Sequence, residues 1–226
     1  MIDMSTLQKD DEIVALLKQG EQQLEYMGYT EHSERHRQIV ARRVVRILKT
    51  MGCDENTCRL GEIAAYLHDI GCAINRHAHA QSGALLAYDL LRSRGMEATE
   101  ATLVANGIAN HDEQHGFPST AIAAALILAD KSDVHKNRVR KDKLDEHRRL
   151  IDYEDIHDRV NFSVLDSKLI IDTEGKKIIF QFQLDSNVSS AMDYFEIFLG
   201  RMKMCQNAAK FFGLEFNLEI NGQILA

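Results

Sequence analysis

Hydrophobic residues recur every three to four positions through most of the first 130 residues, which is the period of an amphipathic helix. The pattern predicts six helices, at residues 7–27, 30–49, 58–70, 79–93, 97–110 and 120–130. The last of these, TAIAAALILAD, is the most apolar, and Ser119 is expected to be its N-cap. A helix that is apolar on all sides is expected to be buried on all sides, so we place it at the centre of a helical bundle.

The hydrophobic period changes from 3.6 to 2 after about residue 160, which is typical of β-strands. Two β-rich runs flank the turn residues Thr173–Lys176 and predict a hairpin. A long amphipathic helix is predicted at 189–212, and a third strand at 214–225. We therefore predict a mainly α protein, with a helical bundle over residues 1–150. A small C-terminal α+β appendage (hairpin, long helix, third strand) over residues 151–226 is expected to pack on it.

Composition narrows the class of protein. With 45% hydrophobic and 27% charged residues, the chain has the profile of a soluble globular protein. A net charge of −7 argues against a nucleic-acid partner for the surface as a whole, and no apolar run approaches the roughly 20 residues of a membrane span. The first residues lack a leader pattern, and the four irregularly spaced cysteines form neither a disulfide framework nor a zinc-ribbon pattern. We therefore expect a cytoplasmic protein with free thiols and no membrane partner.

A basic stretch runs from Lys136 to Arg149 and is diluted by three acidic residues. The pattern has two interpretations: a solvated helix face, or a rim that attracts an anionic substrate. The residue types alone do not separate them.

The stretch LHDIG, residues 67–71, places His68 and Asp69 side by side at the end of an apolar helical run. Burial of an unpaired imidazole and carboxylate is costly, and a metal ion removes this cost because both groups are ligands for first-row metals. Adjacent helical residues point about 100° apart, so this pair cannot chelate an ion alone. Other helices must supply the remaining ligands.

Further candidate ligands occupy helix ends or buried helix faces. These are His36, His79, His111 and Asp130. Taken singly, each has an ordinary interpretation as a core histidine or a helix cap. Together with the doublet they make six residues in the bundle and none in the β-rich tail, which indicates a divalent metal site. Histidine and carboxylate ligands without a thiolate suit Fe, Mn, Co, Mg or Zn.

The order of these motifs resembles that of the HD-domain metal-dependent phosphohydrolases, over about residues 30–135. The histidines and aspartates stand in RHRQIVARRV, LHDIG, HAQSGALLA, NHDEQHGFP and LADKSD. The resemblance implies an HD-type helical domain that holds two divalent ions. By resemblance, the first ion is bound by His36, His68, Asp69 and Asp130, and the second by Asp69, His79 and His111, with Asp69 as the bridge.

The resemblance also implies the reaction, in which a metal-activated hydroxide attacks the phosphorus of a phosphoester, such as a nucleotide. The residues expected at the reacting groups or the substrate are Asp69, Asp133, Arg76 and Lys131. One departure from the family lies directly after HDIG, where a lysine is common and this chain has Cys72. Arg76, Lys131 or Arg138 could replace that lysine.

The local pattern leaves several histidines open. His77 is an alternative to His79, which we prefer because it stands four residues before Gly83 at a helix opening. His115 is a further candidate for proton transfer or substrate contact. The histidines that match no motif are interpreted as surface residues; they are His32, His135, His147 and His157.

Three classes of function are compatible with the predicted metal site. A phosphohydrolase would bind metal and turn over a small phosphorylated substrate such as p-nitrophenyl phosphate or a nucleotide. An HD-like di-iron oxygenase would instead show an iron-specific reaction that depends on O2. A non-catalytic, metal-stabilised binding or regulatory module would use the appendage as its interaction surface, but it is expected to have lost ligands, and none is missing here. A homodimer is compatible with all three.

Overall fold

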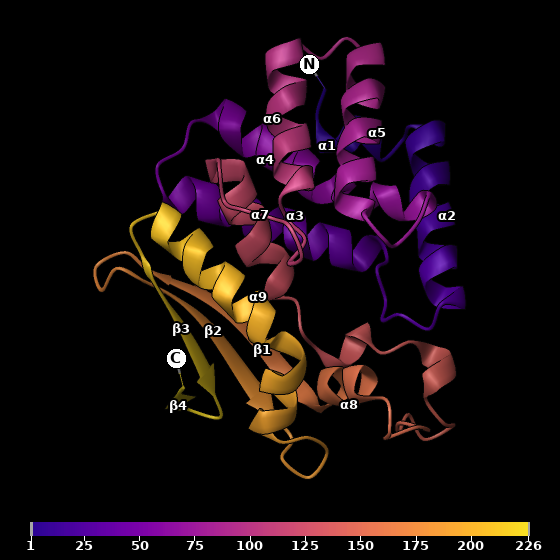
Figure 1. The fold of residues 1–226 in the computed structure, drawn as a ribbon, viewed down its shortest axis with the longest axis vertical. Helices are drawn as coiled ribbons and strands as arrows, with labels where there is room; N and C mark the ends of the chain where they lie inside the picture. Colours follow the sequence, from indigo (N-terminus) through magenta and orange to yellow (C-terminus); the bar gives the residue numbers. More distant parts are fainter. Residues whose placement is uncertain (1, 226) are drawn as a thin grey trace.

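The computed structural model describes residues 2–225, and its first part is a bundle of helices (Figure 1). Its helices are α1 (Met4–Leu7), α2 (Asp11–Tyr26), α3 (Glu34–Thr50), α4 (Glu55–Leu67), α5 (His79–Ser93), α6 (Ala98–Ala109) and α7 (Ala121–Lys131). Every residue of α7 from Ile122 to Ala129 is buried, and α7 packs against α3, α4 and α6. The prediction that the most apolar helix lies at the centre is confirmed.

The C-terminal part combines two helices with a small sheet. Its elements are α8 (Ile156–Ser163), β1 (Val164–Asp172), β2 (Lys177–Leu184), α9 (Ala191–Phe211), β3 (Glu215–Ile220) and β4 (Gln223–Ile224). The sheet order is β1-β2-β3-β4, with β1 antiparallel to β2 and β2 parallel to β3. A parallel pair needs a crossover connection, and α9 provides it. The prediction of a mainly α protein with a small C-terminal α+β part is confirmed, and the division at residue 150 stays a prediction.

The long helix α9 joins the sheet to the bundle. It lies across one face of the sheet, and it also packs against α7 (Figure 1). Alternate residues of β2, Phe180 and Phe182 among them, are buried, and Phe182 lies 5.5 Å from Tyr194 of α9 between ring centroids. This contact holds α9 at the edge of the bundle, next to the end of α7.

Several element boundaries differ from the predicted ones because local capping competes with hydrophobic period. The predicted helix 7–27 is divided, since the Asp10 carboxylate accepts a hydrogen bond from the Ile13 N–H and begins α2 afresh. Thr120, rather than Ser119, caps α7 through the Ala123 N–H. The predicted helix 58–70 begins at Glu55 and ends at Leu67, so His68 and Asp69 lie in the turn that precedes the 3-10 helix η1 (Ile70–Ala73).

The interpretation of the basic stretch as a solvated helix face is wrong. Within residues 136–149 the structure contains two short 3-10 turns, Lys136–Arg138 and Lys141–Lys143, and no α-helix. Arg138 is buried, whereas Arg148 and Arg149 are exposed. The helix α8 that follows was not predicted.

Two further expectations concern the chain as a whole. The four cysteines are free thiols, as predicted. Among residues 2–225, no helix is both long and apolar enough to cross a membrane.

Candidate metal centre

Five helices bring their ends to one point in the bundle. His36 lies in the first turn of α3, the doublet follows α4, His79 opens α5, and His111 follows α6. Asp130 comes from the last turn of α7. All six predicted ligands therefore meet, and each is buried except Asp130, whose side chain is 14% exposed.

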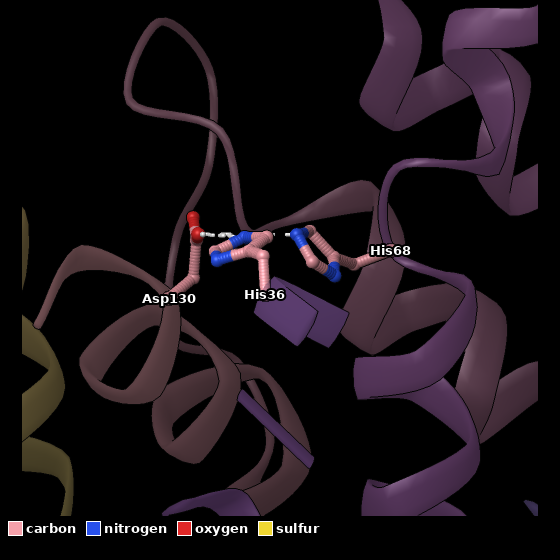
Figure 2. Close-up of side chains that lie close together, drawn as sticks. All are labelled: His36, His68 and Asp130. Atoms are coloured by element: carbon pink, nitrogen blue, oxygen red, sulfur yellow. Dashed lines mark ion pairs between the residues drawn. The ribbon is translucent and has the colours of Figure 1, made fainter. Parts of the chain in front are cut away.

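One half of the cluster consists of two histidines and two carboxylates. His36 Nε2 lies 3.3 Å from Asp130 Oδ1, and His68 Nε2 lies 3.8 Å from the same oxygen (Figure 2). His68 Nε2 also lies 3.0 Å from Asp69 Oδ2. The side chains of three helices thus turn their ligand atoms toward one another.

The other half of the cluster is centred on two histidines. His79 Nε2 lies 3.1 Å from His111 Nε2 and 3.6 Å from Asp69 Oδ1. The two oxygens of Asp69 therefore face different halves: Oδ2 faces His68 and Oδ1 faces His79. This is the placement that a bridging carboxylate requires.

The ring orientation of the four histidines suits metal binding. In each ring, Nδ1 lies within hydrogen-bond distance of an oxygen atom, which belongs to a carboxylate for His36 and to a backbone carbonyl for the other three histidines. For His36, His68, His79 and His111 these oxygens are Asp133 Oδ2 (2.7 Å), Ala65 O (2.7 Å), Arg76 O (3.1 Å) and Ile108 O (2.6 Å). For His68, His79 and His111 the partner is a carbonyl, so Nδ1 donates and the neutral ring carries its lone pair on Nε2, which points into the cluster. His36 Nδ1 faces both Asp133 Oδ2 and Arg138 Nη1, and its Nε2 also points into the cluster.

Three buried atoms in the cluster have no hydrogen-bond partner among residues 2–225. They are His36 Nε2, His68 Nε2 and Asp69 Oδ2. Buried polar groups are normally paired, and the donor set here contains only imidazole nitrogens and carboxylate oxygens. Ligand atoms of His36, His68 and Asp130, and those of His68, Asp69 and His111, lie within 4.8 Å of one another. These residues fit one or two divalent cations.

The electrostatics of the cluster also favour a bound cation. Burial would raise the pKa of Asp69, but the neighbouring His68 and His32 outweigh it and hold that pKa well below its usual range. Burial would likewise raise the pKa of Asp130, and the adjacent Lys131 ammonium lowers it instead. Burial lowers the pKa of His111 well below its usual value, so this ring is neutral near pH 7. Ionised carboxylates beside a neutral imidazole are the forms that bind metal.

The pKa of His68 also indicates that the cluster favours positive charge. Burial alone would lower its pKa, but the carboxylates of Asp69 and Asp130 outweigh burial and raise it. In the absence of an ion, a proton on His68 would supply the positive charge that these two carboxylates require. A divalent ion would displace that proton.

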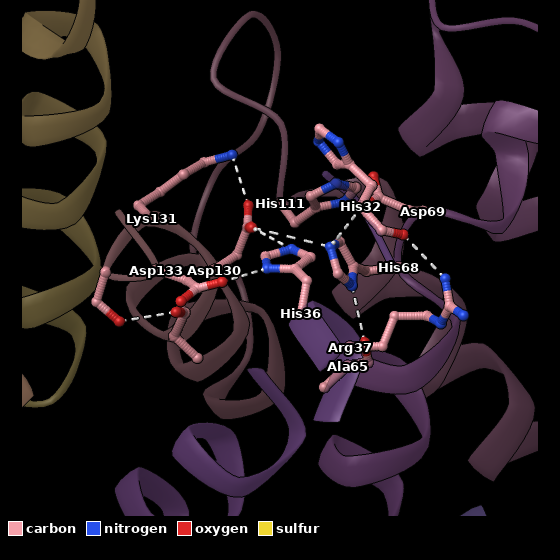
Figure 3. A network of polar contacts seen from close by, with 12 residues as sticks. His32, His36, Arg37, Ala65, His68, Asp69, His111, Asp130, Lys131 and Asp133 are labelled. Carbon is pink, nitrogen blue, oxygen red and sulfur yellow. Dashed lines mark hydrogen bonds and ion pairs between the residues drawn. The ribbon is translucent and has the colours of Figure 1, made fainter. Parts of the chain in front are cut away.

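A cavity of about 430 Å³ opens beside the cluster, and four basic side chains line it: Arg76, Lys131, Arg138 and Arg201. Arg76 Nη1 lies 3.6 Å from Asp69 Oδ1 and 3.2 Å from His79 Nε2. Lys131 Nζ lies 2.8 Å from Asp130 Oδ2 (Figure 3). The predicted contacts Arg76 and Lys131 therefore lie where they can reach both the metal ligands and a bound anion.

Asp133, predicted at the reacting groups, lies behind His36. Its Oδ2 lies 2.7 Å from His36 Nδ1 (Figure 3). The same oxygen lies 3.1 Å from Arg138 Nη1. A carboxylate in this position fixes the orientation of the imidazole. The contact favours a positioning role for Asp133.

The structure also places the residues that the sequence left open. His77 and His115 are exposed and lie outside the cluster, whereas His79 is buried in it. Cys72 Sγ lies 3.9 Å from Asp69 Oδ1, but burial raises the pKa of the thiol to about 12, so it is protonated near neutral pH. In that form it is a poor metal ligand.

Two histidines interpreted as surface residues line the cavity instead. His32 lies 5.7 Å from His36 between ring centroids, and His157 comes from α8. The interpretation is wrong for His32, which is only partly exposed. It lies close enough to Asp69 to lower the pKa of the Asp69 carboxyl. The spacing of four residues between His32 and His36 was the one signal in the sequence for this position.

Asp133→Asn is expected to weaken metal binding roughly 10- to 100-fold, which is typical for loss of a carboxylate that orients a metal-ligating histidine. The amide can turn its oxygen toward Nδ1 but cannot supply the negative charge. Metal titration of the purified variant measures the effect. Asp89→Asn, on the exposed face of α5, is the matched control and should bind as the wild type does. Equal affinities for both variants would contradict the positioning role.

Comparison with known proteins gives two similarities. No protein-family model matches the chain. The uncharacterized protein MJ1020 of Methanocaldococcus jannaschii is 29% identical over 136 residues, and the match covers 50% of this chain. The same match covers 52% of MJ1020, so the chain spans about half the length of the curated relative that it matches.

Among solved structures, a protein described as a predicted HD superfamily hydrolase, from an uncultured Thermotogales bacterium, is similar with a TM-score of 0.44 and 23% identity. The match covers 59% of this chain and 75% of that chain.

Proposed function

We propose that the chain is an HD-type metal-dependent phosphohydrolase that cleaves a phosphoester of a small substrate. The observation that supports this most strongly is the orientation of four buried histidines, each with Nδ1 held by an oxygen and Nε2 turned toward Asp69, Asp130 or another ring. A cavity lined by basic side chains opens on the same cluster. Such a cavity suits an anionic substrate.

The proposed ligands form two overlapping sets. His36, His68, Asp69 and Asp130 would hold one divalent ion, and Asp69, His79 and His111 a second. When bound, such ions lower the pKa of a bound water to near neutrality and neutralise charge on phosphoryl oxygens. The residue types accept Fe, Mn, Co, Mg or Zn.

The chain's own basic residues would bind and orient the phosphoryl group. Burial lowers the pKa of Lys131, but Asp130 and Glu113 outweigh it and raise that pKa, so the ammonium is charged at neutral pH. The Asp69 carboxylate likewise raises the pKa of Arg76. Both cations are held beside metal ligands before any substrate arrives, so little reorganisation is needed at the moment of reaction.

The experiment is a metal analysis of protein purified without added metal, followed by a substrate panel. The panel comprises p-nitrophenyl phosphate, bis(p-nitrophenyl) phosphate and nucleotides. We expect bound divalent ions, turnover of at least one phosphoester, loss of turnover with a chelator, and recovery when metal is restored. The same turnover under anaerobic conditions would exclude the di-iron oxygenase alternative for this reaction. Fully metal-loaded protein that hydrolyses no phosphoester would refute the proposal.

A further inference from the structure

One wall of the cavity comes from the C-terminal part of the chain. Phe198 and Arg201 of α9 both line it, although α9 lies far from the cluster residues in sequence. They stand three residues apart, so they share one side of the helix. This wall lies beside α7, whose last turn carries Asp130 and Lys131.

The guanidinium of Arg201 is held on two sides. Its Nε lies 3.0 Å from Glu113 Oε1, and its central carbon lies 4.4 Å from the centroid of the Phe198 ring. A guanidinium that stacks on a ring and is bonded through Nε has little freedom left. The side chain remains 28% exposed, and its two terminal nitrogens have no acceptor among residues 2–225. The N–H groups of these two terminal nitrogens are therefore free to bind a ligand.

Glu113 connects this arginine to the metal centre. Its other oxygen, Oε2, lies 2.9 Å from Lys131 Nζ, which in turn lies 2.8 Å from Asp130 Oδ2. One carboxylate thus holds two cations, and one of these already neutralises a metal ligand. The second cation, Arg201, has no other acidic partner among the described residues, so it shares its one carboxylate with Lys131 and keeps hydrogen-bonding capacity for an anion.

We propose that Arg201, supported by Glu113 and Phe198, forms a second anion-binding subsite. The preferred substrates would then carry a second phosphate or a carboxylate in addition to the phosphate that is cleaved. The statement that a phosphate is cleaved rests on the proposed function. The binding of an anion by Arg201 can be measured without any turnover. The C-terminal appendage would therefore select the substrate.

The test is calorimetric binding of three non-hydrolysable anions to metal-loaded protein, with the metal content measured before and after. Ethylphosphonate has one anionic group, phosphonoacetate adds a carboxylate, and methylenediphosphonate adds a second phosphonate. Charge-assisted hydrogen bonds to a guanidinium are strong, so the wild type should prefer a two-anion ligand by roughly 10-fold or more. Tighter binding of phosphonoacetate would indicate that the second group is a carboxylate, and tighter binding of methylenediphosphonate would indicate a second phosphate.

Arg201→Gln should reduce that preference to near one while binding of ethylphosphonate and the metal content stay unchanged. Lys203→Gln removes a positive charge from an exposed position of the same helix and should keep the preference. Arg201→Lys should restore part of it. The inference is overturned if Arg201→Gln keeps the wild-type preference, if the wild type shows none, or if Lys203→Gln loses it equally. Failure of hydrolysis with an intact preference would refute the proposed function alone.

Discussion

Asp69→Asn is expected to lower phosphoester hydrolysis by roughly 10³-fold and to reduce metal content by at least one ion per chain. Asp69 is the residue whose two oxygens face both halves of the cluster, toward His68 at 3.0 Å and toward His79 at 3.6 Å. An asparagine keeps the shape but offers one neutral oxygen in place of two charged ones. Metal analysis and steady-state kinetics of the purified variant measure both effects.

Two comparisons keep this result interpretable. Thermal unfolding of the metal-free variant reports whether the fold is intact, and Asp89→Asn repeats the same chemical change on an exposed helix face. We expect Asp89→Asn to match the wild type in metal content and rate. Full activity of Asp69→Asn would leave the proposed bridging role without support.

Gly71→Ala is expected to destabilise the fold by roughly 3 kcal/mol, because overpacking against rigid atoms is costly. A Cβ at Gly71 would lie 2.0 Å from the carbonyl oxygen of His79 and 2.5 Å from the backbone nitrogen of Gly83. Both atoms belong to the first turns of α5 and cannot move without moving the helix. The substitution should therefore also displace His79 from Asp69 and weaken metal binding by the half of the candidate metal centre that contains His79 and His111.

Gly200→Ala is the matched control for this prediction. Among residues 2–225, no atom outside the adjoining backbone of the helix lies within 4 Å of a Cβ added there, and the position is inside α9. Glycine to alanine inside a helix stabilises by up to about 1 kcal/mol, so this variant should melt at or above the wild-type temperature. If Gly71→Ala melts with the wild type, η1 and α5 do not approach as closely as described.

Local pattern was sufficient for most of the fold. The hydrophobic period located the bundle helices, the hairpin and α9, because each buries one continuous face. It failed at residues 136–149, where the basic stretch interpreted as a helix face forms 3-10 turns and loops instead. It also missed α8, which is short and whose N-terminus depends on the Asp155 carboxylate accepting from the backbone of His157 and Asp158.

The residues of the candidate metal centre could be predicted from sequence motifs, but the residues around it could not. Its six predicted ligands stand in motifs whose order resembles that of a known family, so the sequence alone predicted that they would lie together. Glu113 and Arg201 are 88 residues apart and carry no motif, so only the packing of α9 on α7 places them together. His32 was likewise missed, because its position depends on how the loop before α3 enters the cavity.

Anomalous diffraction at the metal absorption edge, from crystals of metal-loaded protein, tests directly whether these residues bind two ions. We predict two peaks roughly 3.5–4 Å apart, as in two-metal hydrolytic sites. One peak should contact His36 and Asp130, the other His79 and His111, and Asp69 should contact both. Anomalous peaks only outside this cluster, or protein that is fully metal-loaded in solution but shows no peak at these residues, would contradict the proposed two-ion site.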